Sequence, residues 1–293
     1  MLKIYYYYNI MNFIYKCLLF TAISVPFYFY YNKNKKSNQI PIEYKQGVII
    51  TGGGGSLGSN LAKKFLTDGS KVLLIDINET VLNNIPKHPL LKTLVCDISN
   101  YTEVNNKMSL INLDDYDTLI NNAGTVNKKS LINLNKNDIE KTFNVNTFSL
   151  FWMTKCILPN FIKHNKGHII TVASIAGLVG SKNLVDYCSS KFAAVGFHKS
   201  LRLELQDTNI NLTCICPYFF TSNMFNGNKG YPWPLSKVFK IYNLDEITNL
   251  IYNDILLKKN MCIYPEAFKS LLDTRFIFPL SIQDQFIALG NDI

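Results

Sequence analysis

Short apolar runs alternate with segments of helical periodicity from residue 46 onward. Each apolar run ends near Gly, Asn, Asp or Pro, which is typical of a buried strand. The segments between them repeat apolar residues at three- and four-residue spacing, which predicts helices that each bury one face. We predict strands at 47–51, 71–76, 92–96, 117–121, 168–174, 212–216 and 261–265.

The order of these elements predicts the fold class. We expect helices at 59–69, around 79–85, around 103–110, at 139–161 and at 189–206. Strands that are almost wholly apolar and alternate with helices indicate a parallel sheet covered on both faces. Right-handed crossovers make that sheet doubly wound. The prediction is therefore α/β: a single Rossmann domain over residues 45–293, with a parallel sheet of about seven strands.

A different pattern precedes this domain. Residues 10–31 form a 22-residue run with one charge, Lys16. About 20 apolar residues span a bilayer core as a helix. Tyrosines, which favour membrane interfaces, flank the run on both sides. We therefore predict a hydrophobic membrane anchor at residues 1–31 and a polar linker at residues 32–44.

Lysines set the expected orientation of the anchor. Lys33, Lys35 and Lys36 follow the run at once, whereas only Lys3 precedes it, so the domain is expected to face the cytosol. Two alternatives stay open. One is a cleaved signal peptide with a cleavage site near Ala22, and the other is an interfacial hairpin bent at Pro26.

Composition narrows the possible partners. Of the net charge of +9, +5 falls on residues 1–47, which hold six lysines and one glutamate. The remaining +4 forms no basic stripe on one element, so we expect no nucleic-acid partner. The seven cysteines include no C-x-x-C pair or Cys/His cluster. We therefore expect buried, reduced thiols and no metal site.

The stretch VIITGGGGSLGSNLA, residues 48–62, indicates a phosphate-binding turn. Glycines between a strand and a helix let the backbone approach a pyrophosphate, which then lies at the helix N-terminus. Two registers fit: G-x-G-x-x-G on Gly53, Gly55 and Gly58, and T-G-x-x-G-x-x-G on Thr51, Gly52, Gly55 and Gly58. A third, T-G-x-x-x-G-x-G, meets Ser56 where its second glycine is expected.

Polar residues that end the next strands support a dinucleotide ligand. Asp76 ends the second strand, where a carboxylate accepts hydrogen bonds from ribose hydroxyls and repels a 2′-phosphate. We therefore expect NAD in preference to NADP, although Asp76 also suits a helix cap. Asp97 ends the third strand, where it suits the adenine amino group. Asn121-Asn-Ala-Gly124 ends the fourth strand with small residues that let backbone lie close to a cofactor.

The candidate catalytic set lies further along the chain. Ser174 ends the fifth strand, Tyr187 follows thirteen residues later, and Lys191 lies one helical turn beyond it, on the same face. An ammonium beside a phenol lowers its pKa, so we expect Tyr187 to exchange protons near physiological pH. Ser174 is expected to hold the substrate oxygen, and Asn146 to anchor a proton-relaying water.

These motifs together resemble the short-chain dehydrogenase/reductase family. TGGGGSLG, NNAG, FNVNT, VASIAG, YCSSK and CPYFF stand in that family's order over about residues 45–265. GHIITVASIAGL and YCSSKFAAVGFHKSL are similar to its membrane-associated retinol dehydrogenase and 17-beta-hydroxysteroid dehydrogenase group. The resemblance implies catalytic roles for Ser174, Tyr187, Lys191 and Asn146. It implies cofactor contacts at Thr51, Gly52, Gly55, Ser56, Leu57, Gly58, Asp76, Asp97, Ile98, Asn121, Ala123, Gly124, Tyr187, Lys191, Pro217 and Ser222.

Three residues depart from the family pattern. Ser56 looks like a swap with Gly55 and adds a side chain where pyrophosphate approaches, which would weaken cofactor binding. Tyr218 stands where glycine is common, and Ser222 stands where a threonine usually meets the nicotinamide amide. Only about 75 residues follow Pro217, too few for the substrate domain of the extended branch of the family.

The segment 218–242 predicts the kind of substrate. Its aromatic residues suit an apolar lid, and beside a membrane anchor that favours a lipophilic alcohol or ketone such as a retinoid, a steroid or a long-chain alcohol. The resemblance further implies the endoplasmic reticulum or lipid droplets, and a homodimer. Two alternatives stay open: an NADPH-dependent lipid ketone reductase, and a non-catalytic membrane scaffold that retains the fold.

Overall fold

The computed structural model describes residues 47–221, 235–237 and 239–273. They divide into two compact units. One, here called the sheet unit, holds residues 47–221 and 241–264. The other includes residues 235–237, 239–240 and 265–273, with the short helix α9 (Ala267–Asp273) and an edge-to-face contact between Phe239 and Phe268. The predicted anchor and linker lie outside the described residues.

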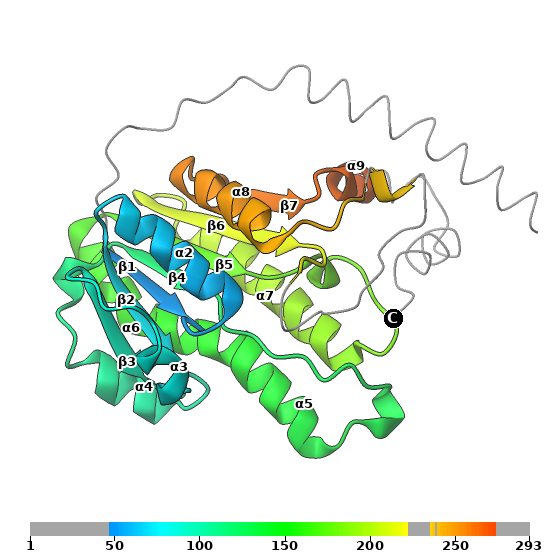
Figure 1. The fold of residues 1–293 in the computed structure, drawn as a ribbon, viewed down its shortest axis with the longest axis horizontal. Coiled ribbons are helices and arrows are strands. Elements are labelled where there is room, and N and C mark those ends of the chain that lie inside the picture. Colours follow the sequence, from blue (N-terminus) through cyan, green and yellow to red (C-terminus); the bar gives the residue numbers. More distant parts are fainter. Residues whose placement is uncertain (1–46, 222–234, 238, 274–293) are drawn as a thin grey trace, which may run out of the picture. The chain divides into compact units, whose positions relative to one another are not determined.

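Seven parallel strands form one sheet in the order β3-β2-β1-β4-β5-β6-β7 (Figure 1). This confirms the predicted fold class and the number of strands. The order reverses direction beside β1, so the carboxyl ends of β1 and β4 border the crevice where open α/β sheets bind ligands. The strands are β1 (Gly47–Thr51), β2 (Lys71–Asp76), β3 (Leu91–Val95), β4 (Thr118–Asn121), β5 (Gly167–Val172), β6 (Ile210–Pro217) and β7 (Met261–Tyr264).

Alternation along the strands builds two hydrophobic layers. Val48 and Ile50 of β1 point to one face of the sheet, while Ile49 points to the other. The first face is covered by α2 (Ser56–Thr67) and α8 (Leu244–Leu256), and α3 (Glu79–Asn83) adds Leu82. The second is covered by α4 (Tyr101–Met108), α6 (Ser149–His164) and α7 (Val185–Glu204).

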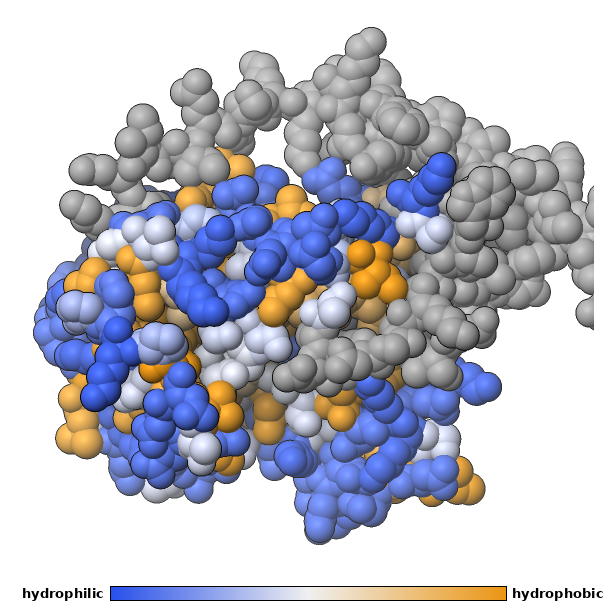
Figure 2. Space-filling model, viewed as in Figure 1, coloured by the Kyte–Doolittle hydropathy of each residue, from blue (hydrophilic) through white to orange (hydrophobic). Residues whose placement is uncertain are grey.

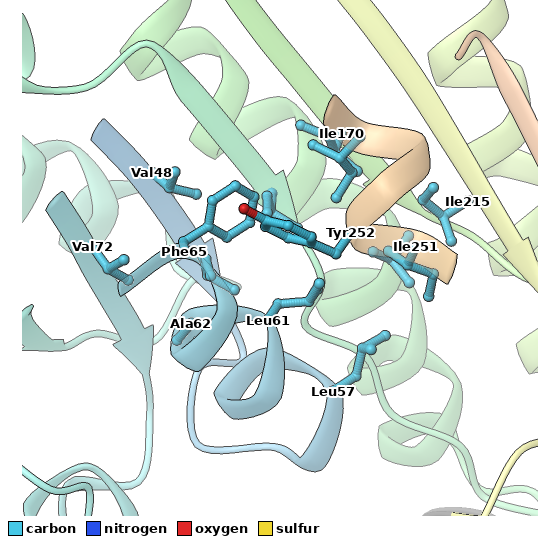
Figure 3. Packing of buried hydrophobic residues seen from close by; sticks show 14 of the residues in the cluster. Val48, Leu57, Leu61, Ala62, Phe65, Val72, Ile170, Ile215, Ile251 and Tyr252 are labelled. Carbon is cyan, nitrogen blue, oxygen red and sulfur yellow. The ribbon is translucent and has the colours of Figure 1, made fainter. Parts of the chain in front are cut away.

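Figure 3 shows the centre of the first layer, where Phe65 of α2 faces Tyr252 of α8. Their ring centroids lie 4.9 Å apart at 70°, an edge-to-face contact. Leu57 and Leu61 extend the same packing toward the carboxyl edge of the sheet. This layer fixes the first turn of α2, and with it the glycine turn that precedes the helix.

Two helical segments differ from prediction. The helix expected at 139–161 is α5 (Lys136–Phe143) followed by a π-helical turn, Asn144–Phe148, and then α6. A π turn adds one residue per turn, which an apolar periodicity of three and four residues does not reveal. Helix α8 was not predicted at all, although Asn243 and Glu246 form a capping box at its start.

Within the part of the chain that the structure describes, no helix is long and apolar enough to cross a bilayer.

Candidate active site

The glycine turn joins β1 to α2 and packs against the end of β4. Gly52 has φ +64°, and a Cβ there would approach Ala123 Cα to 2.8 Å. A Cβ on Gly58 would lie 2.4 Å from the carbonyl oxygen of Gly52. Both positions therefore require glycine for the fold itself, whichever ligand binds there.

The backbone conformation of the Gly55-Ser56 pair does not require glycine, although a Cβ on Gly55 would lie 3.2 Å from the carbonyl oxygen of Gly52. Gly55 caps α2 with an extended backbone, φ −73° and ψ 160°, which any residue can adopt. Ser56 is the first residue of α2, and the helix has no acidic residue in its first turn. The free amides of that turn suit an anion. Ser56 therefore leaves the turn intact, and its cost falls on the space left for a phosphate.

Asp76 points back to this turn. Its Oδ2 accepts a hydrogen bond from the Gly54 amide at 2.9 Å, and its Oδ1 accepts one from the Asn78 amide at 3.0 Å. The helix cap of α3 is Asn78, whose side chain accepts from Val81. Asp76 is therefore not the cap of the helix, and its half-buried carboxylate lies beside the glycine turn.

Asp97 and Ile98 form the turn that follows β3. Asp97 Oδ1 accepts hydrogen bonds from the amide and the hydroxyl of Ser99, at 2.9 and 2.6 Å. The Asp97 amide donates to Glu103 at 3.1 Å, and Ile98 is buried. These bonds hold the turn at the carboxyl edge of the sheet, next to β2.

Two neighbouring asparagines at the end of β4 point their side chains in different directions. Asn121 is buried and donates to Thr154 of α6 at 3.4 Å, so its side chain points away from the glycine turn. Asn122, which sequence reasoning passed over, donates to the carbonyl oxygens of Thr51 and Gly52 at 2.9 and 3.2 Å. Adjacent residues of a strand point in opposite directions, and that rule could have identified Asn122 as the one that contacts the turn.

Thr51 ties the same two strands together. Its hydroxyl accepts hydrogen bonds from the amides of Asn122 and Ala123, at 3.0 and 3.1 Å. Leu57, by contrast, packs its side chain into the first hydrophobic layer, so only its backbone faces the turn. Ser222, the remaining predicted cofactor contact on the segment after β6, lies outside the described residues.

The structure brings together the three predicted catalytic side chains. Tyr187 and Lys191 both lie in α7 and are buried. Tyr187 shares a hydrogen bond with Ser174, and Lys191 Nζ lies 5.8 Å from the centre of the Tyr187 ring. Lys191 Nζ donates to the carbonyl oxygen of Val172 at 2.9 Å, while Ser174 Oγ donates to that of Pro217 at 3.3 Å. The phenol is thus flanked by a hydroxyl and an amine.

The pKa of Tyr187 differs from the sequence-based prediction. Burial raises it to about 12, and the hydrogen bond with Ser174 only partly opposes that rise. Burial also lowers the pKa of Lys191 to about 8. The prediction of a lowered tyrosine pKa was wrong because the loss of water around the phenolate outweighs the hydrogen bond with Ser174. At neutral pH, Tyr187 is therefore a protonated phenol.

Asn146 lies in the π-helical turn beside these residues. Its Oδ1 accepts from the Thr125 amide at 2.8 Å, and its Nδ2 donates to the Thr125 carbonyl oxygen and to Ser190 Oγ at 2.9 and 3.0 Å. Both hydrogens of the Asn146 side-chain amide therefore form hydrogen bonds within the protein. A Cβ on Gly124 would lie 3.4 Å from Asn146 Oδ1 and 3.6 Å from Lys191 Nζ, so that backbone borders both side chains.

Six of the seven cysteines lie in the described part of the chain. None of these six is in a disulfide, and five are buried. Across the described residues, no three His, Cys, Asp or Glu side chains gather as a metal site requires. The glycine turn and the Asp76 carboxylate beside it fit a dinucleotide.

Comparisons with known proteins agree with this geometry. Residues 46–230 match the family described as short chain dehydrogenase. The protein named 17-beta-hydroxysteroid dehydrogenase 13 from Homo sapiens is 34% identical, covering 79% of this chain and 79% of its own. Estradiol 17-beta-dehydrogenase 11 from Homo sapiens is 36% identical, covering 83% and 81%. Short-chain dehydrogenase/reductase family 16C member 6 from Bos taurus is 37% identical, covering 71% and 70%.

Solved structures share the fold at lower identity. A short chain dehydrogenase/reductase from Burkholderia phymatum, in complex with NAD, superposes with a TM-score of 0.70 at 21% identity, covering 83% of this chain and 96% of its own. A short-chain dehydrogenase from Sphingobium yanoikuyae, in complex with NADPH, gives 0.67 at 19%, covering 79% and 94%.

Proposed function

The chain belongs to the short-chain dehydrogenase family of NAD(P)-dependent oxidoreductases that act on hydroxyl groups, and we propose that it is a membrane-anchored enzyme that interconverts a lipophilic alcohol and its carbonyl form. The observation that carries the proposal is the arrangement of Ser174, Tyr187 and Lys191 at the carboxyl edge of the sheet. The chemistry needs one group to hold the substrate oxygen and another to move its proton. Ser174 and Tyr187 share a hydrogen bond there, so one oxygen atom can contact both.

Each residue has a distinct role in this proposal. A nicotinamide cofactor, held by the glycine turn and Lys191, would supply or accept a hydride at the carbon that bears the oxygen. Tyr187 donates its phenol proton to that oxygen in reduction, and takes the hydroxyl proton back in oxidation. Its pKa of about 12 favours the protonated form, which is the form that reduction requires. Ser174 orients the oxygen, and Lys191 holds the nicotinamide ribose and sets the polarity beside the phenol.

We propose NAD in preference to NADP. The carboxylate of Asp76 lies at the end of β2, held toward the glycine turn by the Gly54 amide. A ribose 2′-hydroxyl can donate to that carboxylate, whereas a 2′-phosphate would meet its negative charge. In this proposal, the backbone at Gly52, Gly55, Ser56 and Gly58 holds the pyrophosphate, while Asp97 and Ile98 border the adenine.

The names of the relatives support a lipophilic substrate. Two are named for a 17-beta-hydroxysteroid and for estradiol, both apolar secondary alcohols. The apolar run at residues 10–31 supports an anchor in the endoplasmic reticulum or on lipid droplets, with the sheet unit facing the cytosol. Phe220 packs against the first hydrophobic layer, so the described part of segment 218–242 is partly structural.

A homodimer is part of the proposal. Large apolar side chains stand about half exposed at Phe148 in the π-helical turn and on the outer faces of α6 and α7, at Phe151, Phe192 and Leu203. Pairing these helices with those of a second copy would cover the apolar area. Light scattering on the detergent-solubilised protein is expected to give twice the chain mass, and a single-chain mass would exclude the dimer.

The proposed function is tested with the full chain in microsomal membranes, beside its Tyr187→Phe variant. NADH formation is followed with retinol, steroid alcohols and long-chain secondary alcohols, and the reverse reaction with the matching carbonyl compounds and either NADH or NADPH. We expect turnover that prefers NAD(H) and is lost in Tyr187→Phe. Preference for NADPH would replace the cofactor assignment. Absence of both turnover and dinucleotide binding would favour a scaffold instead of an enzyme.

A further inference from the structure

A buried carboxylate precedes the proposed catalytic tyrosine and has no role in the mechanism described above. Asp186 lies in the first turn of α7, and its side chain is only 3% exposed. Burying a carboxylate is costly unless charged or polar groups compensate. The partners of Asp186 therefore indicate what the residue does.

The partners of Asp186 come from two other segments of the chain. Its Oδ2 accepts hydrogen bonds at 2.8 Å from Asn127 Nδ2, in the segment that follows β4, and at 2.8 Å from Thr142 Oγ1, in the last turn of α5. Its Oδ1 is buried and has no hydrogen-bond partner among the described residues. One carboxylate oxygen thus joins α7, α5 and the β4–α5 connection.

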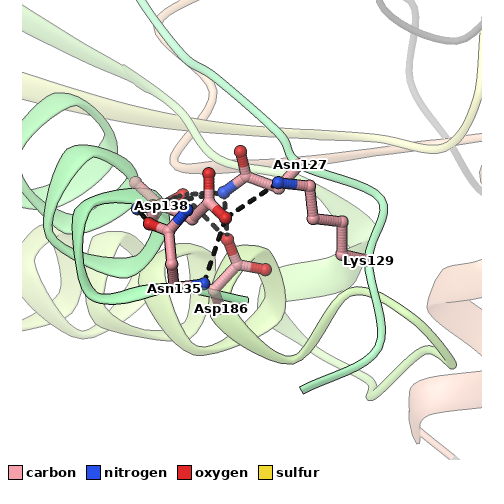
Figure 4. Close-up of polar contacts among 6 residues, drawn as sticks. Asn127, Lys129, Asn135, Asp138 and Asp186 are labelled. Carbon is pink, nitrogen blue, oxygen red and sulfur yellow. Dashed lines mark hydrogen bonds and ion pairs between the residues drawn. The ribbon is translucent and has the colours of Figure 1, made fainter. Parts of the chain in front are cut away.

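Further polar contacts stabilise the solvent-facing side of this junction (Figure 4). Asp138 closes the capping box of α5 with Asn135 and forms an ion pair with Lys129 at 2.8 Å. Asn127 also donates toward the Asp138 carbonyl oxygen at 3.2 Å. In Figure 2, hydrophilic residues predominate on the surface at the α5 end of the sheet unit. Asp186 is therefore the buried member of a junction whose other face meets water.

A second junction lies one helical turn further along the chain, between the π-helical turn and α7. Asn146 follows Thr142 by four residues and donates to Ser190 Oγ at 3.0 Å, and Ser190 Oγ donates to the Tyr187 carbonyl oxygen at 2.7 Å. The Asp186–Thr142 and Ser190–Asn146 contacts therefore flank Tyr187 along α7. Between them, the helix that carries the phenol is held against the π-helical turn that carries Asn146.

We propose that Asp186 is a positioning residue, which fixes the Tyr187 phenol relative to Ser174 and Asn146 by tying the first turn of α7 to Thr142 and Asn127. This inference rests on the proposed role of Tyr187. Proton transfer depends steeply on the placement of donor and acceptor, and a displacement of about 1 Å can cost about 100-fold in rate. The glycine turn and Asp76 belong to other elements, so dinucleotide binding should depend far less on this junction than turnover does.

The test separates turnover from dinucleotide binding in Asp186→Ala and Asp186→Asn, using the alcohol of the panel that gives the highest turnover. We expect Asp186→Ala to lower kcat by roughly 10- to 100-fold and to leave the Kd for NADH, measured by nucleotide fluorescence, within about 2-fold. Asp186→Asn keeps an oxygen that accepts both hydrogen bonds, so its kcat should return to within about 3-fold of the parent. A full kcat in Asp186→Ala, or an Asp186→Asn as impaired as Asp186→Ala, would overturn the proposal.

Threonine variants provide the partner test and its control. Thr142→Val should lower kcat, and adding it to Asp186→Ala should cost no further activity, because Asp186→Ala already breaks the contact between Asp186 and Thr142. Thr248 of α8 is a matched control: it is buried, and its hydroxyl lies within hydrogen-bond distance of the carbonyl oxygen four residues earlier, as that of Thr142 does. Thr248→Val should keep the parent kcat. Equal loss in both threonine variants would show a general effect of stability and overturn the proposal.

Tyr187→Phe in the same assay separates this inference from the proposed function. Turnover retained in Tyr187→Phe would reject the role of Tyr187, and with it the reason for positioning the residue. Turnover lost in Tyr187→Phe but intact in Asp186→Ala would reject only the role of Asp186.

Discussion

Both faces of the sheet carry an apolar layer, but the side of α7 also buries ionisable groups. On the α2 and α8 face, Phe65 and Tyr252 centre a layer whose buried members are almost all apolar (Figure 3). On the side of α7, the buried residues include Tyr187, Lys191 and Asp186, each of which loses water to be there. Burial of apolar surface stabilises a fold, whereas burial of ionisable groups generally costs stability. The comparison indicates that both faces stabilise the fold, and that the α7 side also holds the ionisable groups of the proposed chemistry.

Among these variants, Lys191→Met is expected to show the largest effect, which is a loss of activity without a loss of stability. Methionine keeps the length of the side chain but removes the buried amine, so kcat should fall by at least about 100-fold. The free energy of unfolding should stay unchanged or rise by up to about 3 kcal/mol, because the buried charge is gone. Turnover assays and urea unfolding of the same preparation check both parts. A variant that is both destabilised and inactive would show that Lys191 supports the fold.

Phe65→Ala should have the opposite profile. Phe65 is fully buried in the apolar layer, and removal of its ring should lower the free energy of unfolding by about 3–5 kcal/mol. Because Phe65 lies far along α2 from the glycine turn, the fraction that stays folded should keep its kcat. Urea unfolding measures the free energy of unfolding, and turnover per folded molecule measures kcat. A kcat loss in folded protein would contradict the separation of the two faces.

Acid should destabilise the protein through a buried histidine at the amino end of β5. His168 is 1% exposed and contacts Thr213 at 2.8 Å, and burial lowers its pKa to about 3. Below a pH of about 6.5 the unfolded chain binds a proton that the folded chain does not. Stability is therefore full above that pH and falls toward pH 3, by at most about 1.4 kcal/mol per pH unit.

Urea unfolding between pH 7.5 and 5, compared with a His168→Met variant, checks this slope. Methionine cannot bind the proton, so the variant should show a shallower dependence of stability on pH. Burial also lowers the pKa of His198, which leaves some slope in the variant. Equal slopes in the two proteins would exclude His168 as a source of the acid sensitivity.

Ser56→Gly should produce the smallest change, in cofactor binding. The structure accommodates Ser56 as the first residue of α2, so the remaining cost of its side chain is at the phosphate. We expect the Kd for NADH to fall by about 2- to 10-fold, which corresponds to roughly 0.4–1.4 kcal/mol. Nucleotide fluorescence measures it, with Ser59→Gly, one turn along α2, as the matched control. An unchanged or weaker affinity would show that Ser56 does not crowd the phosphate.

Much of the fold could be predicted because its pattern is local. The strand runs are almost wholly apolar, so the alternation of strands and helices alone indicated a parallel sheet. Helix α8 was missed because the prediction followed apolar runs and did not use the capping box of Asn243 and Glu246. The π-helical turn was missed because apolar spacing does not distinguish it from an α-helix.

The site was only partly predictable because its chemistry depends on distant contacts. The spacing of Tyr187 and Lys191 placed both on one face of a helix, and the structure has them there. The raised pKa of Tyr187 could not be predicted, since it follows from burial by elements that the spacing does not describe. The contacts of Asp186 could not be predicted because its partners, Thr142 and Asn127, lie 44 and 59 positions away in the sequence.

One pair of variants tests the division between the two faces most directly. Tyr187→Phe and Tyr252→Phe make the same chemical change, the loss of one buried hydroxyl, on opposite sides of the sheet. Tyr252 donates to Asp68 and lies in the apolar layer. Its variant should lose roughly 1 kcal/mol of unfolding free energy and keep full turnover. Tyr187→Phe should keep its stability and lose turnover by about 100-fold or more. Turnover that survives in Tyr187→Phe, or falls equally in both variants, would contradict the account.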